Sequence, residues 1–374
     1  IGVMMLSLIF SILMILFGNT SPVLALSGII EGIDFNETLM HGMLSFLLFA
    51  GALHVDISDL LEQKTIILIL ATLGVVFSTF LIGTISYYLF NNLFSISIGY
   101  IYCLLFGALI SPTDPIAVLG ILKETNSPKS LKTTIAGESL FNDGVGVVVF
   151  SVILSIILST ETQFHASEIF ILFAEEAIGG IIYGLILGYL FYRLLKSVDS
   201  YPLEIMLTLA LVMGGYSLSY NLPYHIHVSG PLAMVISGLF IGNHGKMFAM
   251  SETTHNQLFS FWELIDEFLN ALLFVLIGFQ LLNITFNLNF IYSSILLVPI
   301  ILFIRFLGVK ITLMLLGSKN NLIKGSSYVM TWCGLRGGIS VALALSLDSS
   351  LKNNPEIYHL ILSVTFIVVS FSIL

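Results

Sequence analysis

The sequence carries little charge. Of its 374 residues only 9% are Asp, Glu, Lys or Arg, whereas 57% are hydrophobic and the mean hydropathy is +1.03. An ordinary soluble domain has roughly 25% charged residues, so this composition excludes a soluble globule. A transmembrane barrel would show alternating segments of about ten residues, but the apolar runs here are long and apolar on all sides. We therefore expect an all-α polytopic membrane protein.

Cysteine is nearly absent too. Cys103 and Cys333 stand alone in apolar runs, which excludes a disulfide framework and a cysteine metal motif. No signal-peptide pattern precedes the first apolar run. The chain begins at Ile1 without a methionine and ends at Leu374 inside an apolar run, so we expect both ends to be truncated.

Motifs of catalysis are missing as well. The sequence contains neither Gly-x-Ser-x-Gly nor His-Glu-x-x-His, so an intramembrane hydrolase is not favoured and we expect no enzyme activity and no cofactor. A repeat that could line a selectivity filter with carbonyls is also missing, which disfavours a cation channel. No nucleic-acid partner is expected.

Long apolar runs are what the sequence does have. They predict about thirteen transmembrane helices in a single transporter domain, 1–374. Two of them, 21–31 and 228–243, are short and contain Pro22 and Pro231. The predicted spans are 1–17, 21–31, 38–55, 65–90, 96–122, 133–157, 168–195, 203–220, 228–243, 257–282, 290–316, 322–348 and 356–374.

The basic residues predict the orientation. Ten of the thirteen lysines and arginines fall in loops, or at helix ends, that follow odd-numbered spans, and Lys352 alone follows an even-numbered one. By the positive-inside rule this places the N-terminus outside and the C-terminus in the cytoplasm. The compact loops favour a cell membrane, with a bacterial inner membrane as the first choice.

Two spans should be broken. Ser111-Pro-Thr-Asp-Pro115 sets two prolines three residues apart, so the helix must unwind near Thr113. Cys333-Gly-Leu-Arg-Gly-Gly338 places three glycines around Arg336. The broken spans are the fifth and the twelfth, so they cross the membrane in opposite directions. This predicts inverted repeats, about 1–157 and 203–374, linked by a helix at about 168–195.

A polar heptad, Glu138-Ser-Leu-Phe-Asn-Asp-Gly144, interrupts the sixth span. A carboxylate at bilayer depth is costly, so Asp143 is the main functional candidate. On a helix, Ser139 and Asp143 form one stripe, and Glu138 and Asn142 form another. We expect Arg336 to pair with Glu138, because either charge alone would be prohibitively buried.

Other acidic residues leave two interpretations open. Asp114 could cap the second half of the fifth span, with Pro115 at the first helical position, or lie on an ion path. Glu263, Asp266 and Glu267 share a helical face with Asn270. They form either an interfacial polar turn or an acidic funnel for cations.

These motifs together resemble the monovalent cation:proton antiporters of the NhaP and sodium/proton-exchanger type. The resemblance extends from about His41 onward and rests on several stretches in one order. They are Leu48-Phe-Ala-Gly-Ala-Leu-His54, Ser111-Pro-Thr-Asp-Pro115, Gly137-Glu-Ser-Leu-Phe-Asn-Asp143, Val228-Ser-Gly-Pro231, Phe261-Trp-Glu-Leu-Ile-Asp-Glu267 and Gly334-Leu-Arg-Gly-Gly338.

The resemblance implies roles for these residues. Asp143 takes either a proton or the cation, and Ser139 and Thr113 complete a Na⁺ site, with Asp114 in the ion- and proton-binding set. A supporting network is implied for Glu138, Asn142 and Arg336. Ala50 stands where some relatives carry a second acidic ligand. The fold implies a homodimer in the lipid bilayer.

The expected function is exchange of a monovalent cation, Na⁺ first, for H⁺ at Asp143. One titrating aspartate predicts electroneutral one-for-one exchange by alternating access, a stoichiometry that rests partly on the resemblance. A K⁺/H⁺ antiporter is the alternative, and a cation channel is the more distant one.

Overall fold

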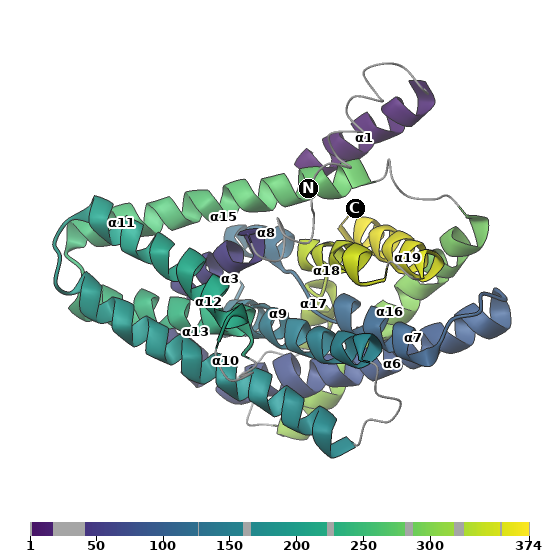
Figure 1. The fold of residues 1–374 in the computed structure, drawn as a ribbon, viewed down its shortest axis with the longest axis horizontal. Helices are drawn as coiled ribbons and strands as arrows, with labels where there is room; N and C mark the ends of the chain where they lie inside the picture. Colours follow the sequence, from purple (N-terminus) through teal and green to yellow (C-terminus); the bar gives the residue numbers. More distant parts are fainter. Residues whose placement is uncertain are drawn as a thin grey trace.

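A computed structural model describes residues 2–17, 42–125, 127–159, 166–222, 228–280, 287–317, 325–351 and 354–373. All regular structure in these residues is helical, which confirms the predicted all-α class (Figure 1). Twelve of the thirteen predicted spans contain helix, and the span predicted at 21–31 lies outside the described residues.

The helices have the lengths of membrane spans. Six runs are long and apolar enough to cross a bilayer, and they are Lys64–Leu93, Lys129–Leu158, Ser167–Leu195, Tyr201–Tyr220, Leu288–Leu316 and Pro355–Ser372. The α-helices, of which short π-helical turns join some, are α1 Gly2–Phe17, α3 Leu44–Leu53, α4 Ile57–Glu62, α5 Lys64–Ile69, α6 Val75–Tyr88, α7 Tyr100–Ile110, α8 Ile116–Glu124, α9 Lys129–Leu158, α10 Ala166–Leu195, α11 Tyr201–Ala210, α12 Tyr216–Tyr220, α13 Gly230–Phe240, α14 Lys246–Phe248, α15 Glu252–Gln280, α16 Leu288–Leu316, α17 Ser326–Trp332, α18 Gly338–Ser350 and α19 Pro355–Ile373.

The helices gather into two groups. In the first group, α3 packs on α13 and α15, α10 packs on α13, and α1 packs on α15. In the second group, α6 packs on α7, and α16 and α18 pack on α19 (Figure 1). Helix α9 packs on α5 and α7 within the second group and on α10 and α13 of the first. We call the boundary between the two groups the seam; α9 lies along it.

Glycines allow the helices inside each group to approach closely. A Cβ on Gly107 of α7 would lie 2.3 Å from the carbonyl oxygen of Thr79 on α6. A Cβ on Gly184 of α10 would lie 2.6 Å from the carbonyl oxygen of Ala233 on α13. Lipid offers no hydrophobic drive for helix association, so such close backbone packing has to hold membrane helices together.

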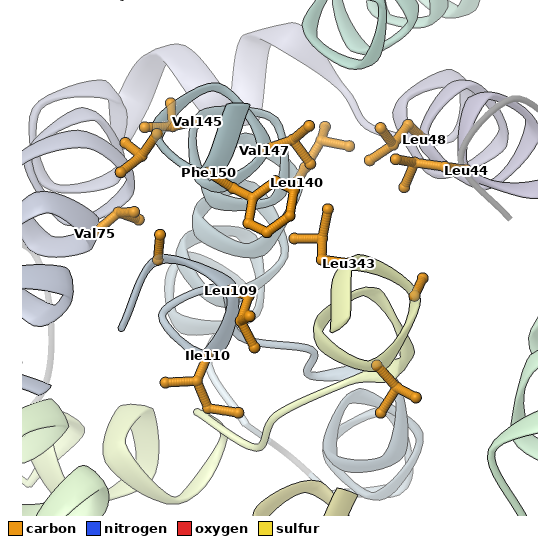
Figure 2. Packing of buried hydrophobic residues seen from close by; sticks show 14 of the residues in the cluster. Leu44, Leu48, Val75, Leu109, Ile110, Leu140, Val145, Val147, Phe150 and Leu343 are labelled. Carbon is orange, nitrogen blue, oxygen red and sulfur yellow. The ribbon is translucent and has the colours of Figure 1, made fainter. Parts of the chain in front are cut away.

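Apolar side chains fix the depth and rotation of α9. Leu140 and Phe150 of α9, Leu109 of α7 and Leu343 of α18 are buried and belong to one hydrophobic cluster, part of which is drawn in Figure 2. Removing such a side chain costs about 2–5 kcal/mol in a well-packed core. The polar heptad of α9 is therefore held in a fixed place between the two broken spans.

Both predicted breaks are present. Helix α7 ends at Ile110 and α8 begins at Ile116, while α17 ends at Trp332 and α18 begins at Gly338. The first break spans Pro112 and Pro115, which cannot donate backbone hydrogen bonds. Helix α7 packs on α18, so the first half of one broken span lies beside the second half of the other.

The two breaks touch. The backbone N–H of Asp114 donates a hydrogen bond to the carbonyl oxygen of Leu335, at 2.8 Å. Gly337 is required at this crossing, because a Cβ there would lie 2.2 Å from Cβ of Asp114. Helix α9 meets the same place at Gly146, where a Cβ would lie 2.3 Å from Cγ of Pro112. Unsatisfied backbone groups of two half-helix pairs thus converge beside α9.

Candidate functional site

Thr113, in the first break, is held by both stripes of α9. The hydroxyl of Ser139 donates to the carbonyl oxygen of Thr113 at 2.8 Å. The Asn142 side-chain amide donates to the Thr113 hydroxyl at 2.8 Å, and its oxygen accepts from the Thr113 N–H at 3.4 Å. Three hydrogen bonds therefore fix an unwound segment that has no helical partners of its own.

Arg336, in the second break, satisfies carbonyls of the first. Its side chain is buried, and Nη1 donates to the carbonyl oxygens of Ser111 and, at 3.1 Å, Pro112. These carbonyls follow the C-terminus of α7, where a cation is favoured by the helix dipole. Arg336 therefore joins the two breaks through backbone oxygens.

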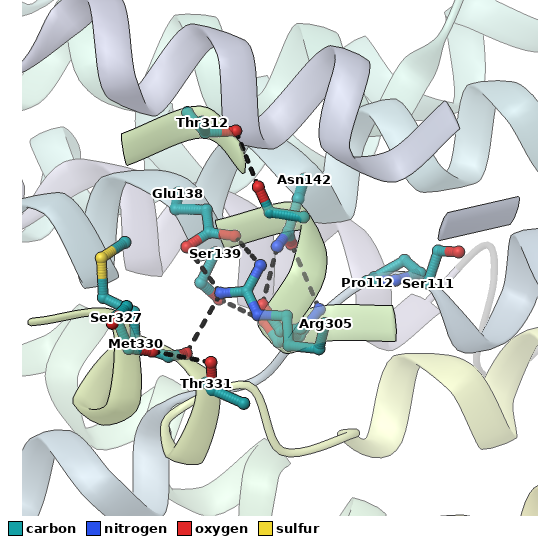
Figure 3. Close-up of polar contacts among 12 residues, drawn as sticks. Ser111, Pro112, Glu138, Ser139, Asn142, Arg305, Thr312, Ser327, Met330 and Thr331 are labelled. Carbon is teal, nitrogen blue, oxygen red and sulfur yellow. Dashed lines mark hydrogen bonds and ion pairs between the residues drawn. The ribbon is translucent and has the colours of Figure 1, made fainter. Parts of the chain in front are cut away.

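The prediction that Arg336 pairs with Glu138 is wrong. Arg305 of α16 makes that ion pair, with Nη2 at 2.8 Å from one carboxylate oxygen and Nη1 bound to the other (Figure 3). Arg305 Nη2 also donates to the carbonyl oxygen of Met330, at 3.3 Å. Arg336 instead directs its Nη1 to the carbonyl oxygens of the first break, and Arg305 reaches the Glu138 carboxylate from α16.

Arg305 is thus the residue that sequence reasoning missed. Arg305 and Arg336 are the two arginines that lie well inside predicted spans, whereas Arg193 lies at the end of one. An arginine at bilayer depth needs a partner, so the rule that selects Arg336 as a partner for Glu138 selects Arg305 as well.

Asp143 faces a cavity of about 180 Å³ in the seam. Its side chain is half-buried, and no hydrogen bond or ion pair joins its carboxylate to any residue that the structure describes. The cavity is lined by Leu47, Leu48, Gly51, Val55, Asp114, Pro115, Leu119, Ala136, Ser139, Leu140, Asp143, Asp266, Asn270, Leu273, Gly338 and Ile339.

The predicted ion ligands lie next to one another but are not equivalent. Asp143, Ser139 and Asp114 line the cavity. Thr113 does not line it. It is buried, and its carbonyl oxygen lies behind the Ser139 hydroxyl to which it is hydrogen-bonded.

Asp114 lies directly before the start of α8. Helix α8 starts at Ile116 with Pro115 as its N-cap residue, so Asp114 precedes that position by one residue. The Asp114 backbone N–H bonds to the second break at the crossing. Asp114 also lines the cavity, which agrees with a place on the ion path.

Of the predicted acidic funnel, only part reaches the cavity. Asp266 lines it together with Asn270, whose amide donates to Asp266 at 3.1 Å. Glu263 and Glu267 are exposed on other faces of α15. One helical turn cannot point all three carboxylates the same way.

The site therefore offers one unpaired carboxylate and several oxygens to a small ligand. Carboxylate, hydroxyl and carbonyl oxygens are ligands for hard cations. Within the described residues there is no group of three histidine, cysteine, aspartate or glutamate side chains that could hold a transition metal. The chemistry fits a proton or a hard monovalent cation.

Comparison with known proteins agrees with this chemistry. Residues 1–374 match the family described as "Sodium/hydrogen exchanger, transmembrane". The chain is 50% identical to the Na(+)/H(+) antiporter NhaP of Pseudomonas aeruginosa, covering 100% of this chain and 87% of that protein. It is 36% identical to the Na(+)/H(+) antiporter NhaH of Halobacillus dabanensis, covering 91% of this chain and 80% of that protein.

The fold also matches a solved structure. The sodium proton antiporter MjNhaP1 from Methanocaldococcus jannaschii superposes with a TM-score of 0.76 at 23% identity, covering 100% of this chain and 94% of that one. This likeness concerns the fold alone. On the family match across its whole length, this chain belongs to the transmembrane sodium/hydrogen exchangers.

Proposed function

We propose that this protein is a secondary active antiporter that exchanges Na⁺ for H⁺ at Asp143. The observation that supports it most is the isolation of the Asp143 carboxylate, which faces a cavity without a described partner, at the crossing of two broken helices. The relatives named above are Na⁺/H⁺ antiporters, which favours the same cation pair.

Coupling follows from neutralisation. An ionised carboxylate enclosed in a low-dielectric site is costly, and either a bound proton or a bound Na⁺ removes most of that cost. The two ligands cannot occupy the carboxylate together. If the site switches between the two membrane faces only when the carboxylate is neutral, each passage of one ligand in one direction requires passage of the other ligand in the opposite direction. One titrating aspartate then gives one-for-one, electroneutral exchange.

The surrounding residues have separate tasks in this scheme. Ser139 and Asp114 supply further oxygens at the cavity, and the Thr113 carbonyl becomes available if the Ser139 hydroxyl rotates away. Asn142, Arg336 and the pair of Glu138 with Arg305 hold the breaks in register.

The membrane context is part of the proposal. We place the protein in the cell membrane as a homodimer, with the N-terminus outside, the C-terminus inside, and the lysine-bearing ends of α8 and α9 in the cytoplasm. The apolar face of α10, with Ile178, Ile182 and Ile186 exposed, is available to lipid and to a second copy.

Proton flux in proteoliposomes tests the function. Na⁺ and K⁺ are titrated separately with the voltage clamped by valinomycin, for the natural protein and for Asp143→Asn, which keeps the size and removes the charge. We expect voltage-independent proton flux that disappears in the variant. Exchange that persists in Asp143→Asn, or current without proton coupling, overturns the proposal. Proton flux that responds to K⁺ and not to Na⁺ would identify K⁺ as the exchanged cation.

A further inference from the structure

A second polar cavity lies in the seam, beyond the one that Asp143 faces. Its volume is about 230 Å³, which has room for several water molecules. The lining comes from α9, α10, the end of α12 and the start of α13, and consists of Val147, Ser151, Glu176, Ser219, Tyr220, Leu222, Val228, Ser229, Gly230 and Pro231.

Glu176 gives this second cavity its charge. No hydrogen bond or ion pair joins its carboxylate to any described residue, and none of the lining residues is basic. Ser151, Ser219 and Ser229 also line the space. A half-buried carboxylate beside serine residues, with no basic side chain among the described residues that line the cavity, is a composition that attracts a small cation.

One face of α9 connects the two cavities. Ala136, Leu140 and Asp143 line the first cavity, and Val147 and Ser151 line the second. The steps between successive members are three or four residues, so all five side chains lie on one helical stripe. The centres of the two sets are about nine residues apart, or about 13 Å along the helix axis.

Along α9, Gly144 lies between the residues that line the first cavity and those that line the second. A Cβ on Gly144 of α9 would lie 3.1 Å from Cδ1 of Leu232 on α13, and both residues are buried. The first cavity takes walls from both helix groups, and the second takes walls from α9, from α12, and from α10 and α13 of the first group. The contact between Gly144 and Leu232 is likewise made across the seam, so a small shift of one group against the other changes it directly.

The cavities lie toward opposite membrane faces. The first is lined by Val55, at the end of α3, and by Leu119 of α8, which leads to the connection with α9 at Lys129. The second is lined by residues at the end of α12 and the start of α13. We call the face at the α12–α13 connection the distal face.

We propose that the second cavity is a docking site for a hydrated monovalent cation on the distal face, with Glu176 as its charge. The cation binds there, separated from Asp143 by the contact between Gly144 and Leu232, and reaches Asp143 when that contact opens. The inference rests on the proposed antiport function, because it assigns the route by which the exchanged cation reaches the site from that face.

Sided transport kinetics with Na⁺ test this assignment. Right-side-out and everted membrane vesicles present opposite faces to the bath, and proton movement is read with a pH-sensitive dye. For Glu176→Gln we expect a KM for Na⁺ about tenfold higher at the distal face, the lower end of what charged clefts contribute. The KM at the other face and kcat should not change, and the effect should shrink as ionic strength rises.

A neighbouring glutamate supplies the matched control. Glu175 is exposed and does not line the cavity, so Glu175→Gln should leave both KM values unchanged. Equal KM values for Glu176→Gln and the natural protein at the distal face overturn the docking site and leave the proposed function intact. A loss of stability without a sided KM change assigns Glu176 a structural role, which also overturns it.

Cysteine accessibility gives an independent readout. The natural cysteines, Cys103 and Cys333, are buried, so a membrane-impermeant thiol reagent should react mainly with an introduced cysteine. We expect Ser151→Cys to react only from the distal face and Ala136→Cys only from the other. Labelling of both variants from one face contradicts the opposed cavities and thereby the proposal.

Discussion

Two carboxylates of α9, five residues apart, have different surroundings. Glu138 is buried, and both of its oxygens accept hydrogen bonds from Arg305. Asp143 faces a cavity, and no described residue pairs with it. The two residues lie only about 7.5 Å apart along the axis of one helix, so a place inside an apolar span does not by itself identify a transport carboxylate. What separates them is whether the protein itself supplies the counter-charge.

The largest expected effect comes from breaking the pair. Arg305→Ala leaves Glu138 buried without a counter-charge, and removal of one partner from a buried ion pair costs about 3–5 kcal/mol. Thermal unfolding in detergent measures the loss. Asp143→Asn, which removes a carboxylate that no described residue pairs with, should not destabilise the protein in the same assay, because no counter-charge is left behind.

A double variant distinguishes charge from packing in this result. Glu138→Gln combined with Arg305→Met removes both charges and keeps similar volumes, so it should recover most of the stability that Arg305→Ala loses. If the double variant is as unstable as the single one, packing of the Arg305 stem is responsible and the comparison with Asp143 fails.

Features that depend on interactions between residues close in the sequence could be predicted from the sequence. Pro112, Pro115 and the glycines around Arg336 act on their own backbone, so both breaks were predicted in place. The stripes of α9 follow from helical periodicity alone. Such local signals need no knowledge of how the helices pack.

Partner choice was not readable in the same way. Glu138 and Arg305 are 167 residues apart, and no local sequence feature favours Arg305 over Arg336 as the partner of Glu138. The position of Asp114 at the crossing depends on Gly337, 223 residues further along the chain. The cavities depend on the fit of two helix groups, which no single segment encodes.

An intermediate effect is expected from Ser139, the stripe partner of Asp143. Ser139→Ala removes a hydroxyl from the cavity and frees the Thr113 carbonyl, so we expect KM for Na⁺ to rise about 3- to 10-fold, as for one net hydrogen bond. Proteoliposome exchange measures it. Thr134→Val is the control, because that hydroxyl bonds to the Ser130 carbonyl, away from the cavity. Equal shifts in the two variants contradict a ligand role.

The smallest expected effect lies at Asp266, a carboxylate of the first cavity that accepts a hydrogen bond from a neighbouring side chain. Asn270 donates to it, so Asp266 is intermediate between Glu138 and Asp143. Asp266→Asn should raise KM for Na⁺ about two- to threefold at the face opposite the distal one, and the change should fade at high salt, as expected for attraction at an entrance. Exposed Glu267, changed to Gln, should have no effect. A loss of exchange activity that is independent of salt and as large as that of Asp143→Asn would instead make Asp266 a second transport carboxylate. In that case, one hydrogen bond from an amide would not prevent a carboxylate from binding the transported ion.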